Sequence, residues 1–537
     1  MLMHSKKRKR HGEIMKPLSS LFLLGWHHLS SRRILIALLF VGVFVRAYKL
    51  GVIPPGLNQD EASTGYDALG MLFFGMDRNG FHNPIMLVGW GSGMDALPTY
   101  LVMPFYLLFG VSVFSLRLLF FVCGVLSLVV FYLICMREDT TFALLALALL
   151  AISPWHILAS RWAFDGNILP LLYLLVVYFV VRGFERQFYF LFAAAFLALI
   201  PYSYGTAFVT VPVFALLSGA YVLIKKRPSL WVVCSSIVIF LICSLPIATY
   251  LLINHNQWES IITPFLSIPR LTGIPRYRTM SVFFHTDMLP NILHNLRVLW
   301  NLLVTGTDGL IWNSIPGYGY AYLFALPLII IGCVSSMVRL RREPNCISPL
   351  FFIWLVSSIV LGMFVAANIN RMNVIFIPLL YFLAAGIRSL ANEKIMRMCL
   401  FSFYTVSFLL FSFHYFGPYS AQAAGPFFAS FGEAITYVSD AVPGPICVTA
   451  QVKQPYIFVL FYRRFDPAVF IQTVHYRNPG AEFQSASSFD RYTFGLDQCD
   501  WNTVQGVIAA QEEVQKMDPA VFSIVPFQRY SVGLRKQ

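Results

Sequence analysis

Long apolar runs separated by short basic clusters dominate this sequence of 537 residues. A helix needs about 20 mainly apolar residues to cross the hydrocarbon core of a bilayer. Because 58% of the residues are apolar and only 12% are charged, about half the share in soluble domains, the sequence predicts a polytopic α-helical membrane protein. The predicted transmembrane helices number about eleven, within a range of roughly ten to thirteen. They cover roughly 33–49, 112–136, 140–157, 167–184, 188–204, 206–224, 230–253, 318–338, 348–367, 372–390 and 396–416.

The basic clusters between these runs predict the orientation of the chain. Residues 1–32 form a basic tail with no small-residue cleavage pattern behind it, which indicates an uncleaved cytoplasmic segment rather than a signal peptide. With this tail inside, the other basic clusters also become cytoplasmic, as the positive-inside rule requires. The predicted transmembrane domain, 33–416, then carries two outer loops, 50–96 and 254–317, on the non-cytoplasmic face of the cell (plasma) membrane.

The net charge of +14 raises the alternative of a nucleic-acid partner. The Lys and Arg residues lie mostly in short clusters between apolar runs, which is typical of membrane topology rather than of a binding stripe. We therefore expect the lipid bilayer as a partner and no nucleic acid.

The C-terminal residues 417–537 are less apolar and more punctuated than the rest. Four short β-like runs alternate there with helical stretches, which predicts a small extracytoplasmic α/β domain; the runs are ICVTAQV, YTFGLDQ, QGVIAA and FSIVPF. Cys447 and Cys499 lie in this domain and could pair if it is outside the cell. No catalytic constellation is visible in it, so we expect a structural cap or an acceptor-docking module.

Acids and arginines gather at the predicted outer ends of the membrane helices. Two adjacent carboxylates follow the first span almost at once, and a third opens a later outer turn. Two basic groups lie in the second outer loop, and another stands before a late span. These residues are Asp60 and Glu61, then Asp165, then Arg276 and Arg278, then Arg371, with His82 and Asp95 later in the first outer loop.

Each of these residues also has a structural explanation. Asp60 and Glu61 could be solvated acids at the start of a short interfacial helix, where the helix dipole favours the ionised form. Adjacent side chains on a helix point about 100° apart, so only one of the pair is expected to face a site. Asp165 could be a helix N-cap, and arginines near helix ends commonly reach lipid headgroups. A second interfacial segment is predicted at 97–110, which contains two prolines.

The order of these features resembles the membrane glycosyltransferases of the C-type fold. In particular, it resembles bacterial relatives of the dolichyl-phosphate-mannose protein mannosyltransferases and of the lipid A aminoarabinose transferase. The resemblance covers roughly residues 33–390. It rests on PPGLNQDEASTGYDALGMLFFGMDRNG, WGSGMDALPTYLVMPFYLLFG and SPWHILASRWAFDGNILPLLYLL, and more loosely on NRMNVIFIPLLYFLAAG.

The resemblance implies a sugar transferase with a polyprenyl-phosphate-linked donor and a protein, lipid or glycan acceptor. It maps the candidate base onto Asp60, with Glu61 beside it, and a second acid onto Asp165. The phosphate partners that match best are Arg276, Arg278 and Arg371. The phosphate-binding Lys of the lipid A branch is absent here. Asp95 and His82 are candidates for contacts to substrate or to a divalent metal, and the sequence leaves the metal open.

The chemistry needs few groups. A carboxylate must remove the proton of the acceptor hydroxyl as it attacks the anomeric carbon, and cationic donors must stabilise the phosphate that leaves. Direct displacement predicts inversion of the anomeric centre. The main alternative is a multispanning transporter or flippase, although such proteins place charges near the membrane midplane and often show two matching halves. A non-enzymatic membrane scaffold is a further alternative.

Overall fold

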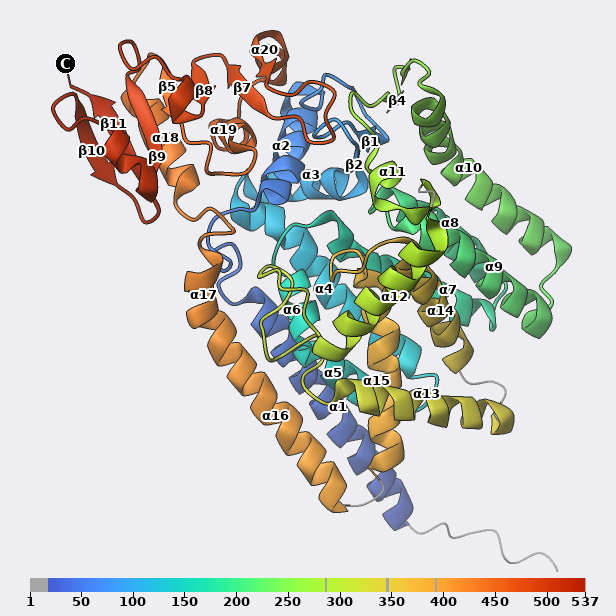
Figure 1. Ribbon diagram of the computed structural model, residues 1–537. Coiled ribbons are helices and arrows are strands. Elements are labelled where there is room, and N and C mark those ends of the chain that lie inside the picture. The colour runs from blue at the N-terminus through green and yellow to red at the C-terminus, as the bar shows by residue number, and fades with distance from the viewer. Residues whose placement is uncertain (1–17, 285–286, 344–346, 392–393, 537) are drawn as a thin grey trace, which may run out of the picture.

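The computed structural model describes residues 18–284, 287–343, 347–391 and 394–536. Residues 1–17 of the predicted basic tail 1–32 therefore lie outside the described residues. Figure 1 shows a helical bundle with a smaller sheet-containing region packed at one end. This architecture confirms the predicted fold class, a polytopic helical protein with a small C-terminal α/β region.

Each predicted span overlaps a helix of the bundle. Within the described ranges, six helices are both long and apolar enough to cross a membrane, and four shorter helices are apolar. The count of about eleven spans stays a prediction. The helices at the predicted spans are α1 (Leu18–Ala47), α4 (Val113–Cys135), α5 (Thr140–Ile152), α7 (Leu169–Gly183), α8 (Tyr189–Leu199), α9 (Ala207–Lys226), α10 (Leu230–Asn256), α13 (Ala325–Arg342), α14 (Ser348–Phe364), α15 (Phe376–Leu390) and α16 (Lys394–Phe416).

The predicted span 140–157 is broken in the structure. Ser153 ends α5 and caps the short helix α6 (Pro154–Ala159). Pro154 has no N–H to donate and its ring crowds the preceding turn, which favours the end of α5 at this point.

Ion pairs at the other end of the bundle join loops that were all predicted to be cytoplasmic. Arg339 at the end of α13 pairs with Glu138, which follows α4. Arg388 near the end of α15 pairs with Asp139 at 2.6 Å. These contacts place the ends of α4, α13 and α15 on one side of the molecule, away from the C-terminal region (Figure 1).

Two arginines with fully buried side chains tie the bundle together. Arg46 in α1 donates to the carbonyl oxygens of Leu150 at 3.0 Å and Ala151 at 2.9 Å, at the end of α5. Arg161, after α6, donates to the carbonyl oxygens of Arg46 at 2.6 Å and Ile53 at 3.1 Å. Because the carbonyl oxygens satisfy these buried donors, the segment after α6 is fixed against the loop that follows α1.

Three further helices lie at or beside the end of the bundle that faces the C-terminal region. Helices α2 (Gln59–Phe74) and α3 (Leu97–Phe109) form where interfacial segments were predicted. Helix α12 (Met288–Thr305) differs from the prediction, which gave 254–317 as a loop. Polar residues interrupt its apolar sequence, and it forms because one side, including the buried Leu299, packs on α14.

The C-terminal region, residues 417–536, contains one seven-stranded mixed sheet in the order β10-β11-β9-β5-β8-β7-β6. The four predicted β-like runs contain β5, β8, β9 and β10, whereas β6, β7 and β11 were not predicted. The strands are β5 (Ile446–Val448), β6 (His475–Tyr476), β7 (Ala486–Phe489), β8 (Tyr492–Phe494), β9 (Gly506–Ala510), β10 (Phe522–Pro526) and β11 (Tyr530–Arg535). The α-helices are α17 (Pro418–Ala423), α18 (Phe431–Ala441), α19 (Pro455–Arg463) and α20 (Pro467–Thr473). Two short 3-10 helices are η5 (Leu496–Gln498) and η6 (Gln511–Lys516).

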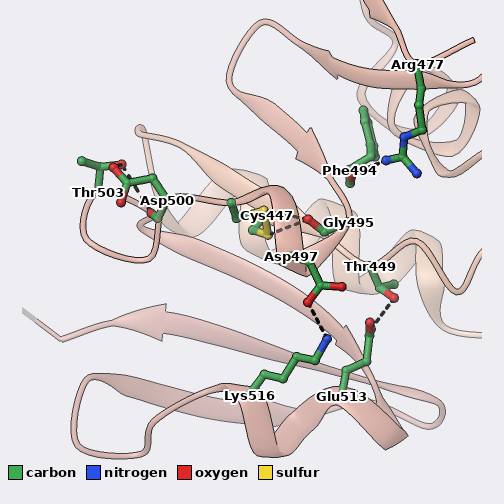
Figure 2. Close-up of a disulfide and its surroundings, with 11 residues drawn as sticks. Cys447, Thr449, Arg477, Phe494, Gly495, Asp497, Asp500, Thr503, Glu513 and Lys516 are labelled. Carbon is green, nitrogen blue, oxygen red and sulfur yellow. Dashed lines mark hydrogen bonds and ion pairs between the residues drawn. A yellow bond between two sulfur atoms is a disulfide. The ribbon is translucent and has the colours of Figure 1, made fainter.

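A disulfide joins Cys447 in the central strand β5 to Cys499, 52 residues later (Figure 2). Strand β5 pairs in parallel with both β8 and β9, so Cys447 lies opposite Thr493 and Val507. The bond therefore ties the middle of the sheet to the segment after β8. The structure thus contains the disulfide between Cys447 and Cys499 that the sequence allowed.

The C-terminal region packs directly on the first outer loop. Phe483 forms an antiparallel bridge with Gly91, and the backbone N–H of Gln484 donates to the Trp90 carbonyl oxygen at 2.8 Å. The Gln484 side-chain amide also donates to Thr272 Oγ1 at 2.8 Å. Helix α19 packs on α2. These contacts enclose a space between the sheet region, the two outer loops and the helix ends.

Candidate active site

A cavity of about 1230 Å³ lies where the outer loops, the helix ends and the C-terminal region meet. Its wall combines apolar side chains with acids and bases brought together from segments far apart in the sequence. The ionisable groups that line it are Asp60, Asp95, Asp165, His255, Arg276, Arg371, Lys453 and Arg477.

Asp60 lies in the first turn of α2 and lines the cavity. The preceding Asn58 is the N-cap of α2, and its side-chain oxygen accepts the Asp60 backbone N–H at 3.1 Å. The half-buried carboxyl group thus lies at the positive end of a helix. Burial raises the pKa of Asp60, the positive charge of Arg276 opposes this rise, and Glu61 adds to it.

Glu61, next to Asp60, does not line the cavity. Its side chain is fully buried and accepts two hydrogen bonds from Arg117, from Nε and Nη2, each at 2.8 Å. It also accepts the backbone N–H groups of Asn58 at 3.0 Å and Ala163 at 2.8 Å. The 100° rotation per helical residue turns Glu61 away from the side that Asp60 faces. Glu61 therefore positions the start of α2 against α4 and the segment after α6.

Asp165 begins the short 3-10 helix η1 (Asp165–Ile168), which leads into α7. Its side chain is 8% exposed and lines the cavity. Its Oδ1 accepts a hydrogen bond of 3.0 Å from Thr64 Oγ1, one turn after Asp60 on α2. Phe164, not Asp165, is the N-cap residue of η1, so the alternative that Asp165 serves as a helix N-cap is wrong.

Asp95 in the short strand β2 (Met94–Asp95) is the third acid of the cavity wall. Burial raises the pKa of Asp95 to about 7, and the backbone N–H of Gly205 and the charge of Arg276 oppose the rise. In the described part of the chain, no group of three or more His, Cys, Asp or Glu residues could hold a metal ion. A metal contact through Asp95 stays a prediction.

Two arginines of the predicted phosphate site line the cavity without an ion pair to any described carboxylate. Arg276 begins α11 (Arg276–Met280), and its guanidinium lies over the Phe483 ring at 5.2 Å from the centroid. Arg371 donates from Nη1 to the Ala366 carbonyl oxygen at 3.0 Å. Burial lowers the pKa of Arg371, and the charge of Arg276 adds to this effect. Most N–H donors of the two guanidinium groups are therefore available to a ligand.

Besides Glu61, two more of the predicted residues lie outside this cavity. Arg278 is two residues from Arg276 on α11, about 200° around the helix, and it contacts the His255 carbonyl oxygen at 3.1 Å. His82 is exposed, and its Nδ1 lies 2.7 Å from the Gly75 carbonyl oxygen. The structure does not bring either side chain to Asp60.

Lys453 and Arg477 line the cavity and were not predicted from the sequence. Both come from the C-terminal region, which shows no catalytic pattern by itself. No local signal marks them, because they line the cavity only through the packing of that region on the outer loops.

Comparisons with known proteins agree with this architecture. Residues 96–253 match the family model described as dolichyl-phosphate-mannose-protein mannosyltransferase. The crystal structure of ArnT from Cupriavidus metallidurans bound to undecaprenyl phosphate is similar over 93% of this chain and 97% of that chain, with a TM-score of 0.53 and 14% identity. This chain has the C-type fold of membrane glycosyltransferases.

The apo state of the same ArnT is similar over 95% of this chain and 98% of that chain, with a TM-score of 0.52 and 14% identity. None of the curated proteins matches the sequence. In this C-type fold, the cavity with its three aspartates lies between the outer loops and the C-terminal region.

Proposed function

We propose that this chain is a glycosyltransferase that moves a monosaccharide from a polyprenyl-phosphate donor to an acceptor hydroxyl on the non-cytoplasmic face. The observation that carries the proposal is the single cavity that contains Asp60, Asp165 and the unpaired guanidinium groups of Arg276 and Arg371. The C-type fold and the family match over 96–253 support the reaction class.

Asp60 acts as the general base. As the acceptor oxygen attacks the anomeric carbon, its proton moves to the Asp60 carboxylate, and the bond between that carbon and the phosphate oxygen breaks. The electron pair of the broken bond stays on the phosphate. Because the nucleophile displaces the leaving group directly, the anomeric centre is inverted. Asp165, held by Thr64, is the second acid of the site and is placed to bind hydroxyl groups of the sugar.

Arg276 and Arg371 bind the donor phosphate. The phosphate gains charge as it leaves, and guanidinium groups in a water-poor cavity stabilise that charge without protonating it. The aromatic ring of Phe483 holds the Arg276 guanidinium in place, so less side-chain freedom is lost when the phosphate binds.

Apolar residues of α9, α10 and the loop after α11 line another part of the cavity and suit the lipid chain of the donor. They include Phe208, Val209, Leu251, Leu252 and Phe283. Helix α10 has large exposed apolar residues along most of its length, as a helix in contact with lipid does. A polyprenyl chain could therefore pass from the bilayer to the phosphate site. The ArnT structure with undecaprenyl phosphate supports a donor of this kind.

Two observations support the proposed orientation in the plasma membrane. The Cys447–Cys499 disulfide fits an oxidising compartment outside the cytoplasm, and the ion pairs of the predicted cytoplasmic loops lie at the opposite end of the bundle. We accordingly propose a cytoplasmic tail 1–32, a transmembrane domain 33–416 and an extracytoplasmic domain 417–537. The acceptor is a protein, a lipid or a glycan with a free hydroxyl group.

The test uses the full-length protein in detergent with a panel of polyprenyl-phosphate sugars. We expect time-dependent loss of one donor, formation of free polyprenyl phosphate, and a product whose anomeric configuration by NMR is opposite to that of the donor. Arg371→Gln should weaken donor binding, whereas Arg270→Gln, an exposed arginine of the second outer loop that does not line the cavity, should not. Retained anomeric configuration would overturn the displacement mechanism. If none of the donors is consumed, the transferase proposal is overturned.

A further inference from the structure

The cavity contains two basic residues for which the proposed donor site has no role. Lys453 lies between β5 and α19, and Arg477 follows β6, so both belong to the C-terminal region. Of the donor arginines, Arg276 comes from the second outer loop and Arg371 from the turn between α14 and α15. Among the described residues that line the cavity, there are thus four Lys and Arg side chains and three Asp side chains.

The side chain of Lys453 is available to a ligand. It is exposed, and its ammonium group makes no hydrogen bond or ion pair with any described residue. The segment that carries it is nevertheless anchored. Thr449 donates its hydroxyl to the buried Glu513 and its backbone N–H to the Ile508 carbonyl oxygen at 2.8 Å, and the Cys447 disulfide precedes it (Figure 2).

Arg477 has a fixed direction and spare donors. Its Nη2 donates to the Phe494 carbonyl oxygen at 2.9 Å, as Figure 2 shows, while its own backbone N–H donates to the Ser485 carbonyl oxygen at 2.8 Å. A guanidinium group has five N–H donors, and this contact uses one of them. Phe494 and Ser485 also line the cavity, so the anchored arginine lies within its wall.

The two basic pairs come from different parts of the chain, and the Arg276 guanidinium also packs on the Phe483 ring of the C-terminal region. In Figure 1 the C-terminal region lies on one side of β2 and α11, and α9 and α10, whose apolar residues suit the donor lipid, lie on the other. Asp60 lies in the same cavity and must contact the acceptor hydroxyl. An acceptor that reaches Asp60 from the side of the C-terminal region passes Lys453 and Arg477, and basic groups of this kind bind phosphate and carboxylate oxygens.

We propose that Lys453 and Arg477 form the acceptor subsite, and that the acceptor carries a phosphate or a carboxylate group near the hydroxyl that is glycosylated. This inference rests on the proposed function, because it assigns the donor phosphate to Arg276 and Arg371. It gives the C-terminal region a part in acceptor recognition and defines the acceptor by charge.

Equilibrium binding tests the inference without turnover. The full-length protein in phosphatidylcholine nanodiscs is titrated with three probes: hexyl glucoside, its 6-phosphate and hexyl glucuronide. We expect at least one anionic probe to bind about tenfold more tightly than the neutral probe, as one charge-assisted contact provides. Lys453→Ala and Arg477→Ala should remove most of this preference and leave neutral-probe binding unchanged. Lys516→Ala removes a lysine of the same region that pairs with Asp497 outside the cavity, and should behave as wild type.

Undecaprenyl phosphate binding to the same variants separates the two sites. Its affinity should be unchanged in Lys453→Ala and Arg477→Ala. Equal affinity of wild type for all three probes would overturn the inference, and so would a loss of undecaprenyl phosphate binding in these two variants, which would assign them to the donor. Failure of the proposed function would appear instead as an absence of donor turnover, which these titrations do not measure. A preference for the 6-phosphate or for the glucuronide identifies which anion the acceptor carries.

Discussion

Thr64 donates a hydrogen bond of 3.0 Å from its Oγ1 to Oδ1 of Asp165, and so joins the interfacial helix α2 to the start of α7. Asp60 lies one turn earlier on α2 and lines the same cavity as Asp165. The contact therefore fixes the second acid of the site relative to the proposed base.

The variant Thr64→Val tests this positioning role. Valine keeps the shape of threonine and removes the donor, so Asp165 loses a contact of about 1.4 kcal/mol, and we expect kcat to fall roughly tenfold. Thr99→Val is the matched control, because Thr99 Oγ1 is buried and has no hydrogen-bond partner among the described residues. Steady-state kinetics with a saturating donor measure both variants. Equal kcat values for Thr64→Val and wild type would show that the contact does not matter for the reaction.

The buried pair of Glu61 and Arg117 predicts an effect on stability. Removing one partner of a buried ion pair leaves the other charge uncompensated and typically costs about 3–5 kcal/mol. Glu61→Gln should therefore lower the midpoint of thermal unfolding in detergent. The double variant Glu61→Gln, Arg117→Met should recover part of the loss, because no unpaired charge is left. If Glu61→Gln instead unfolds at the wild-type temperature while activity is lost, Glu61 belongs to the chemistry.

The charge of Arg276 predicts a change in the pH profile. Burial raises the pKa of Asp60 and Arg276 opposes this rise, so removing the arginine charge should raise the pKa further. The base must be ionised to accept a proton, and activity therefore rises as pH increases through this pKa. We expect the acidic limb of kcat/KM in Arg276→Gln to move to higher pH. The limb should stay in place in Arg270→Gln, and a limb that moves to lower pH in Arg276→Gln contradicts the assignment.

The disulfide between Cys447 and Cys499 predicts a further stability effect. A cross-link that closes a loop of this length typically stabilises the folded state by about 2–4 kcal/mol. The variant Cys447→Ala, Cys499→Ala should unfold at a lower temperature, and dithiothreitol should lower the wild-type midpoint but not that of the variant. Cys234→Ala, which removes an exposed free thiol, serves as control. A midpoint for the double variant equal to that of wild type would show that the bond does not stabilise the fold.

Hydropathy and helix periodicity were sufficient to predict the bundle, because a membrane span has a strong and local sequence signal. Helix α12 was missed for the opposite reason, since polar residues interrupt its sequence and its stability comes from packing on α14. The break at Pro154 depended on a single residue inside an apolar run that the prediction treated as one span. Local composition thus predicts long spans better than breaks or a helix such as α12, whose apolar sequence is interrupted by polar residues.

The candidate site was partly predictable. Sequence reasoning selected Asp60 and Asp165, and the structure brings both to one cavity. The resemblance assigned the base to Asp60, but nothing in the sequence showed the structural role of Glu61, because that role depends on Arg117, which lies 56 residues after Glu61. No sequence pattern pointed to Lys453. It lies in the cavity because the C-terminal region packs on the outer loops, and the prediction treated these two regions separately.

The proposed role of Asp60 as the base is tested most directly by the variant Asp60→Asn in a single-turnover experiment with prebound donor. The amide keeps the size of the side chain but cannot accept the acceptor proton. We predict that polyprenyl-phosphate sugar binds with wild-type affinity and that the rate of sugar transfer falls by a factor on the order of 10² to 10⁴. Transfer by Asp60→Asn at the wild-type rate would contradict the account.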